Sequence, residues 1–289
     1  MRARSAFLSD LHLGSPNCHV RELADFLAQL SVRKLYLVGD VIDLWWMASN
    51  RVRLDHEQTS VIEHLRALAR GGTEIIYIPG NHDRPLRDLC GLVVPGMVIR
   101  RDAVHRAADG RRYLVTHGDD FDDLVAHGGW RERLGDRLYD HILAGNRLTN
   151  RLRRRLGMRY WSLADFIKRQ SSLAQDYIER YVDACTSAAI ARGLDGVICG
   201  HIHRPALLQH RGIIYANDGD WVESLTAITE ADDGALSLVR WRGQCETLLE
   251  LPAATQAPQQ PRCAESIPGA SAKARPQIEA TEPATEEAD

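Results

Sequence analysis

Five short groups of Asp, His and Asn residues recur along the chain, and side chains of these types bind divalent metal ions. They are Asp10-Leu11-His12, Gly39-Asp40-Val41-Ile42-Asp43, Gly80-Asn81-His82-Asp83, His117-Gly118-Asp119 and Gly200-His201-Ile202-His203. The groups contain no cysteine, so the donors are oxygen and nitrogen atoms, which suit Mn²⁺, iron or Zn²⁺ at a catalytic site. An aspartate that bridges two such ions about 3.5–4 Å apart would let them clamp a phosphoryl oxygen and activate hydroxide.

Each group follows an apolar run with strong β propensity, as residues 196–199 before the paired histidines illustrate. Loops at strand ends are where scaffolds of this kind carry catalytic residues. Alternate residues of an extended strand point to opposite sides, so a site shared by His201 and His203 requires a bent loop. A lone His-x-His pair is weak evidence, but five groups in this order, each after a strand signal, indicate a metal site.

Strand and helix signals alternate on both sides of these groups. We expect strands at 5–8, 35–38, 74–78, 98–99, 112–116, 206–210, 213–216, 224–229 and 235–240, with helices at 20–30 and 55–69. This alternation predicts an α/β fold in which helices cover a β-sheet core.

The pattern changes to long helical segments between His117 and Gly200, at roughly 130–155 and 162–192. We interpret residues of about 122–192 as an α-helical cap insertion within a domain that spans 1–251. Residues 252–289 are rich in Pro, Ala, Gln and Glu and contain no aromatic residue. Such a composition buries too little apolar surface to order itself, so it predicts a disordered C-terminal tail.

Composition narrows the class of protein. The chain has 289 residues and a formal net charge of −3, so its overall charge gives no reason to expect nucleic acid as a partner. The six cysteines form no Cys-x-x-Cys pair, which is typical of reduced thiols in a cytosol-like compartment. The N-terminal apolar run is too short for a signal peptide, and no run approaches the roughly 18 apolar residues of a membrane span. We expect a cytoplasmic protein, either soluble or peripheral on the cytoplasmic face of the membrane.

An arginine-rich stretch at 147–159 has three interpretations. It is an exposed helix face, a basic wall that binds the phosphates of a substrate, or an amphipathic helix on an anionic membrane. A lipid-linked substrate would combine the last two. The candidate substrate-binding residues here are Arg151, Arg154, Arg155 and Trp161.

The five groups, in their order, resemble the calcineurin-like metallophosphoesterases over residues 3 to about 241. The resemblance implies a four-layer β-sandwich flanked by helices, with a dinuclear metal centre at strand ends. The implied ligands are Asp10, His12 and His203 for one ion, Asp40 as the bridge, and Asn81, His117 and His201 for the second ion. It also implies that His82 lies beside the substrate phosphate and that Asp83 orients it.

Within that family the chain is most similar to the UDP-2,3-diacylglucosamine pyrophosphohydrolases of lipid A synthesis. The similarity rests on His117-Gly118-Asp119, on Gly200-His201-Ile202-His203-Arg204-Pro205 and on the helical insertion between them. It implies two divalent ions, with Mn²⁺ favoured over iron or Zn²⁺. It also implies attack of metal-activated hydroxide on phosphorus, which releases UMP and a lipid sugar phosphate.

One position departs from that group, where an arginine stands in place of His82. An arginine stabilises a phosphate leaving group by its charge, whereas a histidine can also protonate an alkoxide. His82 therefore keeps a broader phosphodiesterase or phosphatase of the same fold as an alternative. A non-catalytic scaffold is a further alternative, but it predicts gaps in the ligand set, and every position is filled.

Three further aspartates have two interpretations each. Asp43 either caps the turn after its strand or accepts a hydrogen bond from a ligand histidine. Asp119 either belongs to a solvated acidic run at a helix start or contacts a ligand or substrate. Asp220 lies in an Asn-Asp-Gly-Asp turn, or it supports a histidine of the last motif.

Overall fold

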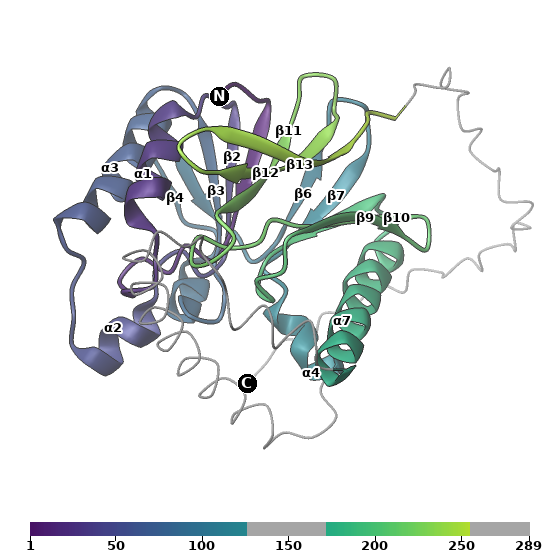
Figure 1. The fold of residues 1–289 in the computed structure, drawn as a ribbon, viewed down its shortest axis with the longest axis horizontal. Helices are drawn as coiled ribbons and strands as arrows, with labels where there is room; N and C mark the ends of the chain where they lie inside the picture. Colours follow the sequence, from purple (N-terminus) through teal and green to yellow (C-terminus); the bar gives the residue numbers. More distant parts are fainter. Residues whose placement is uncertain (126–171, 255–289) are drawn as a thin grey trace, which may run out of the picture. The chain divides into compact units, whose positions relative to one another are not determined.

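Two β-sheets lie face to face in the computed structural model, which describes residues 1–125 and 172–254 (Figure 1). One sheet has eight strands and the other has five. Buried residues from both sheets form a shared core between them, including Phe7, Tyr36, Ile78, Val115 and Ile198. The described chain is therefore a β-sandwich, as the resemblance of its motifs implies.

The eight-stranded sheet has the strand order β13-β12-β11-β1-β2-β3-β5-β4. Its strands are β1 (Ser5–Leu8), β2 (Lys34–Val38), β3 (Glu74–Ile78), β4 (Val93–Val94), β5 (Met97–Ile99), β11 (Thr226–Glu230), β12 (Leu236–Trp241) and β13 (Cys245–Leu251). Strands β1, β2, β3 and β5 are parallel, and the other neighbours pair antiparallel. The carboxyl ends of β1, β2 and β3 therefore lie at one edge of the sheet.

The five-stranded sheet has the order β6-β7-β8-β10-β9. Its strands are β6 (Ala103–Arg106), β7 (Arg112–Val115), β8 (Gly196–Cys199), β9 (Ala206–His210) and β10 (Ile213–Asn217). Strands β7, β8 and β10 are parallel to one another. The segments after β7 and β8, which carry the motifs of His117 and of the paired histidines His201 and His203, therefore also lie side by side.

Helices cover the outer face of each sheet. On the eight-stranded sheet, α1 (Val20–Gln29) and α3 (His56–Arg70) bury apolar stripes that include Leu23, Phe26 and Val61. On the five-stranded sheet, α7 (Ser172–Ala191) buries Tyr181, Cys185 and Ala189. Shorter elements are α2 (Leu44–Asn50), α4 (Asp122–Val125) and the 3₁₀ helices η1 (Arg84–Leu89) and η2 (Asp119–Phe121). The order of layers is helix, sheet, sheet, helix.

Strand β2 illustrates how alternation separates the cores. Leu35 and Leu37 face the helices α1 and α3, whereas Tyr36 and Val38 face the second sheet. All four side chains are buried, and burying an apolar side chain of this size contributes about 1.5–3 kcal/mol. Because both faces of β2 are covered, its residues 35–38 form an uninterrupted apolar run in the sequence, as is typical of central parallel strands.

Most of the predicted elements are present, with boundaries within a few residues. The capping box of Asp55 and Gln58 begins α3, and Gly71 ends it. Strands β6 and β13 were not predicted, since β13 is mostly exposed and mixes Glu and Thr with Leu. The expected strand at 224–229 begins two residues later, because the backbone at Leu225 is left-handed, with φ of 54°.

The expected helical cap agrees less well with the structure than the strands do. We expected the segment at 162–192 to belong to the cap, but its described part, α7, packs on the five-stranded sheet as the fourth layer. The expected helix at 130–155, the arginine-rich stretch and the tail beyond residue 254 lie outside the described residues. Among the residues that are described, no helix is both long enough and apolar enough to cross a membrane.

A buried polar network joins the two sheets at Glu230 of β11. One carboxylate oxygen lies 2.9 Å from His105 Nε2 on β6, and the other lies 2.5 Å from Arg4 Nη1. The Tyr36 hydroxyl is 3.1 Å from the other ring nitrogen of His105. Burial opposes ionisation of Glu230, but the hydrogen bond and charge of His105 outweigh it and lower the pKa of Glu230 to about 2.

This network should make the free energy of unfolding depend on pH in the acidic range. The folded pKa of Glu230 lies below the ordinary value of 4.5, so its contribution is complete above pH 4.5 and is lost as the pH falls towards 2. A shift of this size corresponds to roughly 3 kcal/mol. We expect Glu230→Gln to lower the free energy of unfolding by about that amount near neutral pH, and the difference from wild type to shrink in acid.

Urea unfolding in EDTA across this pH range measures the difference. The matched control is Glu246→Gln on β13, which removes a carboxylate from an exposed position. The control should follow the wild type at every pH. A difference between Glu230→Gln and wild type that stays constant from neutral pH to pH 2 would contradict the assignment.

Candidate metal centre

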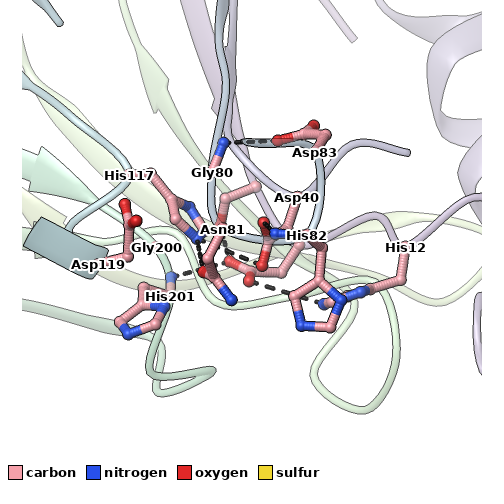
Figure 2. A network of polar contacts seen from close by, with 12 residues as sticks. His12, Asp40, Gly80, Asn81, His82, Asp83, His117, Asp119, Gly200 and His201 are labelled. Carbon is pink, nitrogen blue, oxygen red and sulfur yellow. Dashed lines mark hydrogen bonds and ion pairs between the residues drawn. The ribbon is translucent and has the colours of Figure 1, made fainter. Parts of the chain in front are cut away.

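Five strand ends bring the predicted ligands to one side of the sandwich (Figure 2). Asp10 and His12 follow β1, Asp40 follows β2, Asn81 follows β3, His117 follows β7, and His201 and His203 follow β8. Backbone hydrogen bonds connect the loops: the Asp10 N–H donates to the Gly39 carbonyl, and the Gly200 N–H donates to the His117 carbonyl. Both sheets therefore contribute to one cluster.

Five of the predicted ligands have a left-handed backbone. Their φ angles are 53° at Asp10, 50° at His12, 52° at Asp40, 70° at His201 and 50° at His203. This conformation costs a non-glycine residue about 1–2 kcal/mol. It persists only where the surrounding structure imposes it, and such residues concentrate at functional sites. The bent loop that paired histidines require is present in the last motif.

The first group of donors surrounds Asp10. Asp10 Oδ1 lies 3.2 Å from His203 Nε2 and 3.8 Å from His12 Nε2. His12 Nδ1 is held by Asp43, whereas its Nε2 is buried and has no hydrogen-bond partner among the described residues. A buried donor atom that points at a carboxylate and another imidazole fits a divalent cation between the three side chains.

The second group surrounds Asp40 and His117. His117 Nδ1 donates to the Val38 carbonyl at 2.8 Å, so its Nε2 faces Asp40 Oδ2 at 3.3 Å and Asn81 Oδ1 at 3.1 Å. The ring of His201 lies beside that of His117, with 5.2 Å between the centroids. Figure 2 shows Asp40, Asn81 and His117 turned towards one another. This set of oxygen and nitrogen donors fits a second divalent cation, with Asp40 between the two groups.

Glycines of the motifs make room for these side chains. A Cβ atom on Gly80 would collide with Asp40 Oδ1 and His117, and one on Gly200 would collide with Ser9 and Asp10. Neither glycine has a positive φ, so the backbone conformation does not require glycine at these positions. Glycine is needed because there is no room for a side chain. The donors could not approach one another so closely if these two positions carried side chains.

One carboxylate, that of Asp43, holds two histidines. Its Oδ2 lies 3.1 Å from His12 Nδ1, and its Oδ1 lies 2.9 Å from His82 Nδ1. Asp43 also accepts the Trp46 N–H at 2.9 Å and so caps α2, while it contacts a histidine that the resemblance implies as a ligand. His82 is part-buried beside Trp45, with 5.6 Å between ring centroids.

The expectation that Asp83 orients His82 is wrong. The Asp83 carboxylate is fully buried and accepts hydrogen bonds from the Val41 N–H, the Gly80 N–H and the Tyr77 hydroxyl. It therefore fixes the loop that carries Asn81 and His82, and Asp43 orients the ring instead. Burial and the charge of Asp40 raise the pKa of Asp83.

Charge is concentrated in the cluster. Burial opposes ionisation of Asp10 and Asp40, but neighbouring histidines outweigh it and hold the pKa of both carboxyl groups below the usual range. Burial also opposes protonation of His12, but the hydrogen bond that it donates to Asp43 and the charges of Asp40 and Asp10 raise its pKa to about 9. Asp40, through its charge and its hydrogen bond, and the charge of Asp10 also raise the pKa of His117. Protons on His12 and His117 can therefore balance part of the negative charge of the carboxylates.

Two buried residues behind Asp10 were not predicted. The Ser9 hydroxyl contacts an Asp10 carboxylate oxygen and lies 2.6 Å from Asp218 Oδ1. Burial raises the pKa of Asp218 well above its usual value, and the charge of Asp10 adds to the effect. Asp218 belongs to the turn in which we singled out Asp220. A sequence gives no sign of which turn aspartate points inward, because that depends on the packing of β10 against β8.

The remaining predicted residues have different surroundings. Asp119 is mostly buried and accepts two hydrogen bonds from Arg87 Nη2, at 2.7 and 2.8 Å, so it is not part of a solvated run. Asp220 Oδ1 accepts backbone N–H groups of its own turn, and its Oδ2 lies 3.8 Å from His203 Nδ1. Arg151, Arg154, Arg155 and Trp161 lie outside the described residues.

Residues 3–205 match the model of the family described as calcineurin-like phosphoesterase. The chain belongs to this family, so the resemblance drawn from its motifs is confirmed, and so is the metallophosphoesterase fold class. Membership makes it a hydrolase of phosphoester or pyrophosphate bonds that depends on divalent metal ions.

Two curated relatives carry the name UDP-2,3-diacylglucosamine hydrolase. The protein of Haemophilus influenzae (strain PittGG) is 25% identical over 79% of this chain and 95% of its own length. The protein of Neisseria gonorrhoeae (strain ATCC 700825 / FA 1090) is 28% identical over 80% of this chain and 96% of its own length. Among solved structures, YfcE, a phosphoesterase from E. coli, is 15% identical over 86% of this chain and 98% of its own, with a TM-score of 0.45.

Metal binding to this cluster should strengthen with pH. The pKa values of His12 and His117 are raised, so both rings carry a proton near neutrality that a metal ion must displace. We expect the apparent affinity for Mn²⁺ to rise at least about tenfold per pH unit between pH 7 and 9. Isothermal titration calorimetry in buffers of different ionisation enthalpy measures both the affinity and the released protons.

A matched variant tests the cause of this dependence. Asp43→Asn replaces the carboxylate whose hydrogen bond with His12 contributes most to the raised pKa of that histidine, so the metal affinity of the variant should depend less on pH in the same range. The overall affinity of the variant at high pH reports separately on the orientation of His12. A wild-type affinity that does not change between pH 7 and 9 would contradict the charge arrangement.

Proposed function

We propose that this chain uses two divalent ions, with Mn²⁺ as the expected metal, to hydrolyse the pyrophosphate bond of a UDP-linked diacylated amino sugar. The products would be UMP and a lipid sugar phosphate. The cluster of donors at the strand ends carries the two-metal part of the proposal, above all the buried, unpaired Nε2 of His12 beside Asp10 and His203. The names of relatives that match over nearly their whole length support the substrate class.

The residues that would hold the ions are Asp10, His12 and His203 for the first, Asp40 as the bridge, and Asn81, His117 and His201 for the second. When bound, two such ions polarise a phosphoryl oxygen and make hydroxide available near neutral pH. The role of the protein itself is to hold the donor side chains in fixed positions. Asp43 orients His12, the Val38 carbonyl orients His117, and Ser9 contacts Asp10.

His82 would act on the leaving group. Asp43 engages its Nδ1, which leaves Nε2 for the substrate, and the backbone N–H of His82 donates to Asp40 Oδ1 at 2.8 Å. The ring therefore has a fixed position relative to the bridging carboxylate. As an imidazolium it stabilises the charge of a departing phosphate, and it can also donate a proton.

The pairing of His82 with Asp43 favours a second candidate activity, hydrolysis of a phosphodiester or phosphomonoester. An alkoxide leaving group needs a proton more than a phosphate does, and a histidine held by a carboxylate can supply one. A non-catalytic role has less support, because no predicted ligand position within the described residues lacks a donor side chain.

The partner implied by this function is a lipid-linked nucleotide sugar. We propose that the part of the expected insertion at about 122–171, with the candidates Arg151, Arg154, Arg155 and Trp161, receives its acyl chains and phosphates. Because such a substrate lies in a membrane, we propose that the protein acts as a peripheral protein on the cytoplasmic face of the membrane.

Cleavage of UDP-2,3-diacylglucosamine tests the substrate. We expect wild-type protein with Mn²⁺ to release UMP and diacylglucosamine phosphate, identified by mass, and His201→Ala to lose at least about 100-fold in rate. The control is His210→Ala, which removes a histidine of β9 that pairs with Asp183 of α7 and belongs to none of the five motifs. If the lipid remains intact while an aryl phosphodiester is cleaved with the same dependence on His201, the substrate proposal fails and the two-metal chemistry stands.

The role of His82 gives a different prediction for each kind of bond. We expect His82→Arg to stay within about tenfold of wild type on the pyrophosphate, since an arginine also stabilises a phosphate. On an alkyl phosphodiester the same variant should lose about 10²–10⁴-fold, because no proton donor remains. His56→Arg, an exposed position at the start of α3, controls for the added charge. Equal losses on both substrates would contradict a proton-donating role.

A further inference from the structure

Asp122 is a carboxylate outside the proposed ligand set that contacts a proposed ligand. Its Oδ2 lies 2.7 Å from His201 Nε2, and its Oδ1 accepts a hydrogen bond from the Tyr177 hydroxyl at 2.8 Å. Asp122 begins α4, Tyr177 lies on α7, and His201 follows β8. One carboxylate thus connects an outer helix to the edge of the metal centre.

His201 is oriented in the opposite sense to two other proposed ligands. His12 and His117 each engage Nδ1, with Asp43 and with the Val38 carbonyl, and turn Nε2 towards the cluster. In His201, Nε2 is the engaged nitrogen, so Nδ1 is the one left for an ion. In a neutral imidazole one nitrogen carries the proton and the other a lone pair, so the partner of the first decides which nitrogen can bind a metal.

We propose that Asp122 is a positioning residue for the second metal ion, with Tyr177 fixing its carboxylate. This rests on the proposed function, in which His201 is a ligand of that ion. Asp122 keeps the proton of His201 on Nε2 and so presents the Nδ1 lone pair. Carboxylates that hold a ligand histidine in this way fix the ring and increase its basicity, and their loss typically lowers metal affinity about 10–100-fold.

The histidine side of this contact is mostly buried, whereas the Asp122 side chain is 43% exposed. The side chain of His201 is 14% exposed, and the ring of Tyr181 on α7 lies 6.1 Å from it, centroid to centroid. The backbone N–H of His201 donates to Asp10 Oδ2 at 3.0 Å. Two carboxylates therefore hold this residue, Asp10 through the backbone and Asp122 through the ring. Without Asp122, the ring would be free to rotate about its bonds while its backbone stayed in place.

Asp43 provides a comparison within the same protein. Asp43 holds His12, which belongs to the first ion, whereas Asp122 holds His201, which belongs to the second. The two aspartates share no histidine. Substitution of each should therefore weaken a different ion, which a general loss of stability would not do.

The experiment measures Mn²⁺ binding to the full chain by calorimetry and by electron paramagnetic resonance. Wild type should bind two ions and show the exchange-coupled signal of a close pair. Asp122→Ala should keep one ion at wild-type affinity, bind the second about 10–100-fold more weakly and show the signal of isolated Mn²⁺ at one equivalent. Asp122→Asn should lose less affinity for the second ion, because its amide oxygen still accepts a hydrogen bond from His201 Nε2–H. Tyr177→Phe should lose the least affinity.

The matched control is Asp120→Ala, which removes a neighbouring carboxylate that pairs with Arg101 at the surface. It should bind both ions as wild type does. If wild type itself binds fewer than two ions, the proposed function fails, and this inference fails with it. If wild type binds two ions and Asp122→Ala binds both with unchanged affinity, the inference alone is overturned.

Thermal unfolding in EDTA separates a folding defect from a metal-binding defect. Variants whose unfolding temperature in EDTA equals that of wild type report only on the metal site. If Asp122→Ala does not fold, Asp122→Asn and Tyr177→Phe decide the question. Unchanged affinity for the second ion in both of them would overturn the proposal.

Discussion

The negative charge of three clustered carboxylates, those of Asp10, Asp40 and Asp43, is the constraint on which the site depends. Each keeps a lowered pKa despite burial, because histidines around it supply compensating charge. A buried charge without such a partner costs several kcal/mol. In the proposed function the histidines would therefore have two roles: protonated, they balance the carboxylates, and neutral, they would bind the divalent ions that replace those protons.

The sandwich creates this cluster by joining two sets of parallel strand ends. The eight-stranded sheet contributes Asp10, Asp40 and Asn81, and the five-stranded sheet contributes His117 and His201. Neither sheet holds enough donors alone, so the site exists only while the core between the sheets is packed. The left-handed backbone at the ligands opposes folding locally, and the buried side chains of the three cores offset it. Ions that bind only this arrangement should stabilise it.

Local patterns in the sequence predicted most of the strands and the helices α1 and α3, because each depends on residues close together in the chain. Contacts between distant segments were not accessible in this way. Asp83 is adjacent to His82, which made it the expected partner, yet α2 brings Asp43 to that ring instead. Asp122 and Asp218 belong to polar stretches typical of turns, and only the packing of α7 and β10 shows that they face the cluster.

Anomalous diffraction from crystals grown with Mn²⁺ would show whether two metal ions share Asp40, since it locates the ions independently of activity. We expect two peaks about 3.5–4 Å apart, one within bonding distance of Asp10, His12 and His203, and both adjacent to Asp40. A single peak, or two peaks that leave the Asp40 carboxylate without a metal contact, would contradict this expectation.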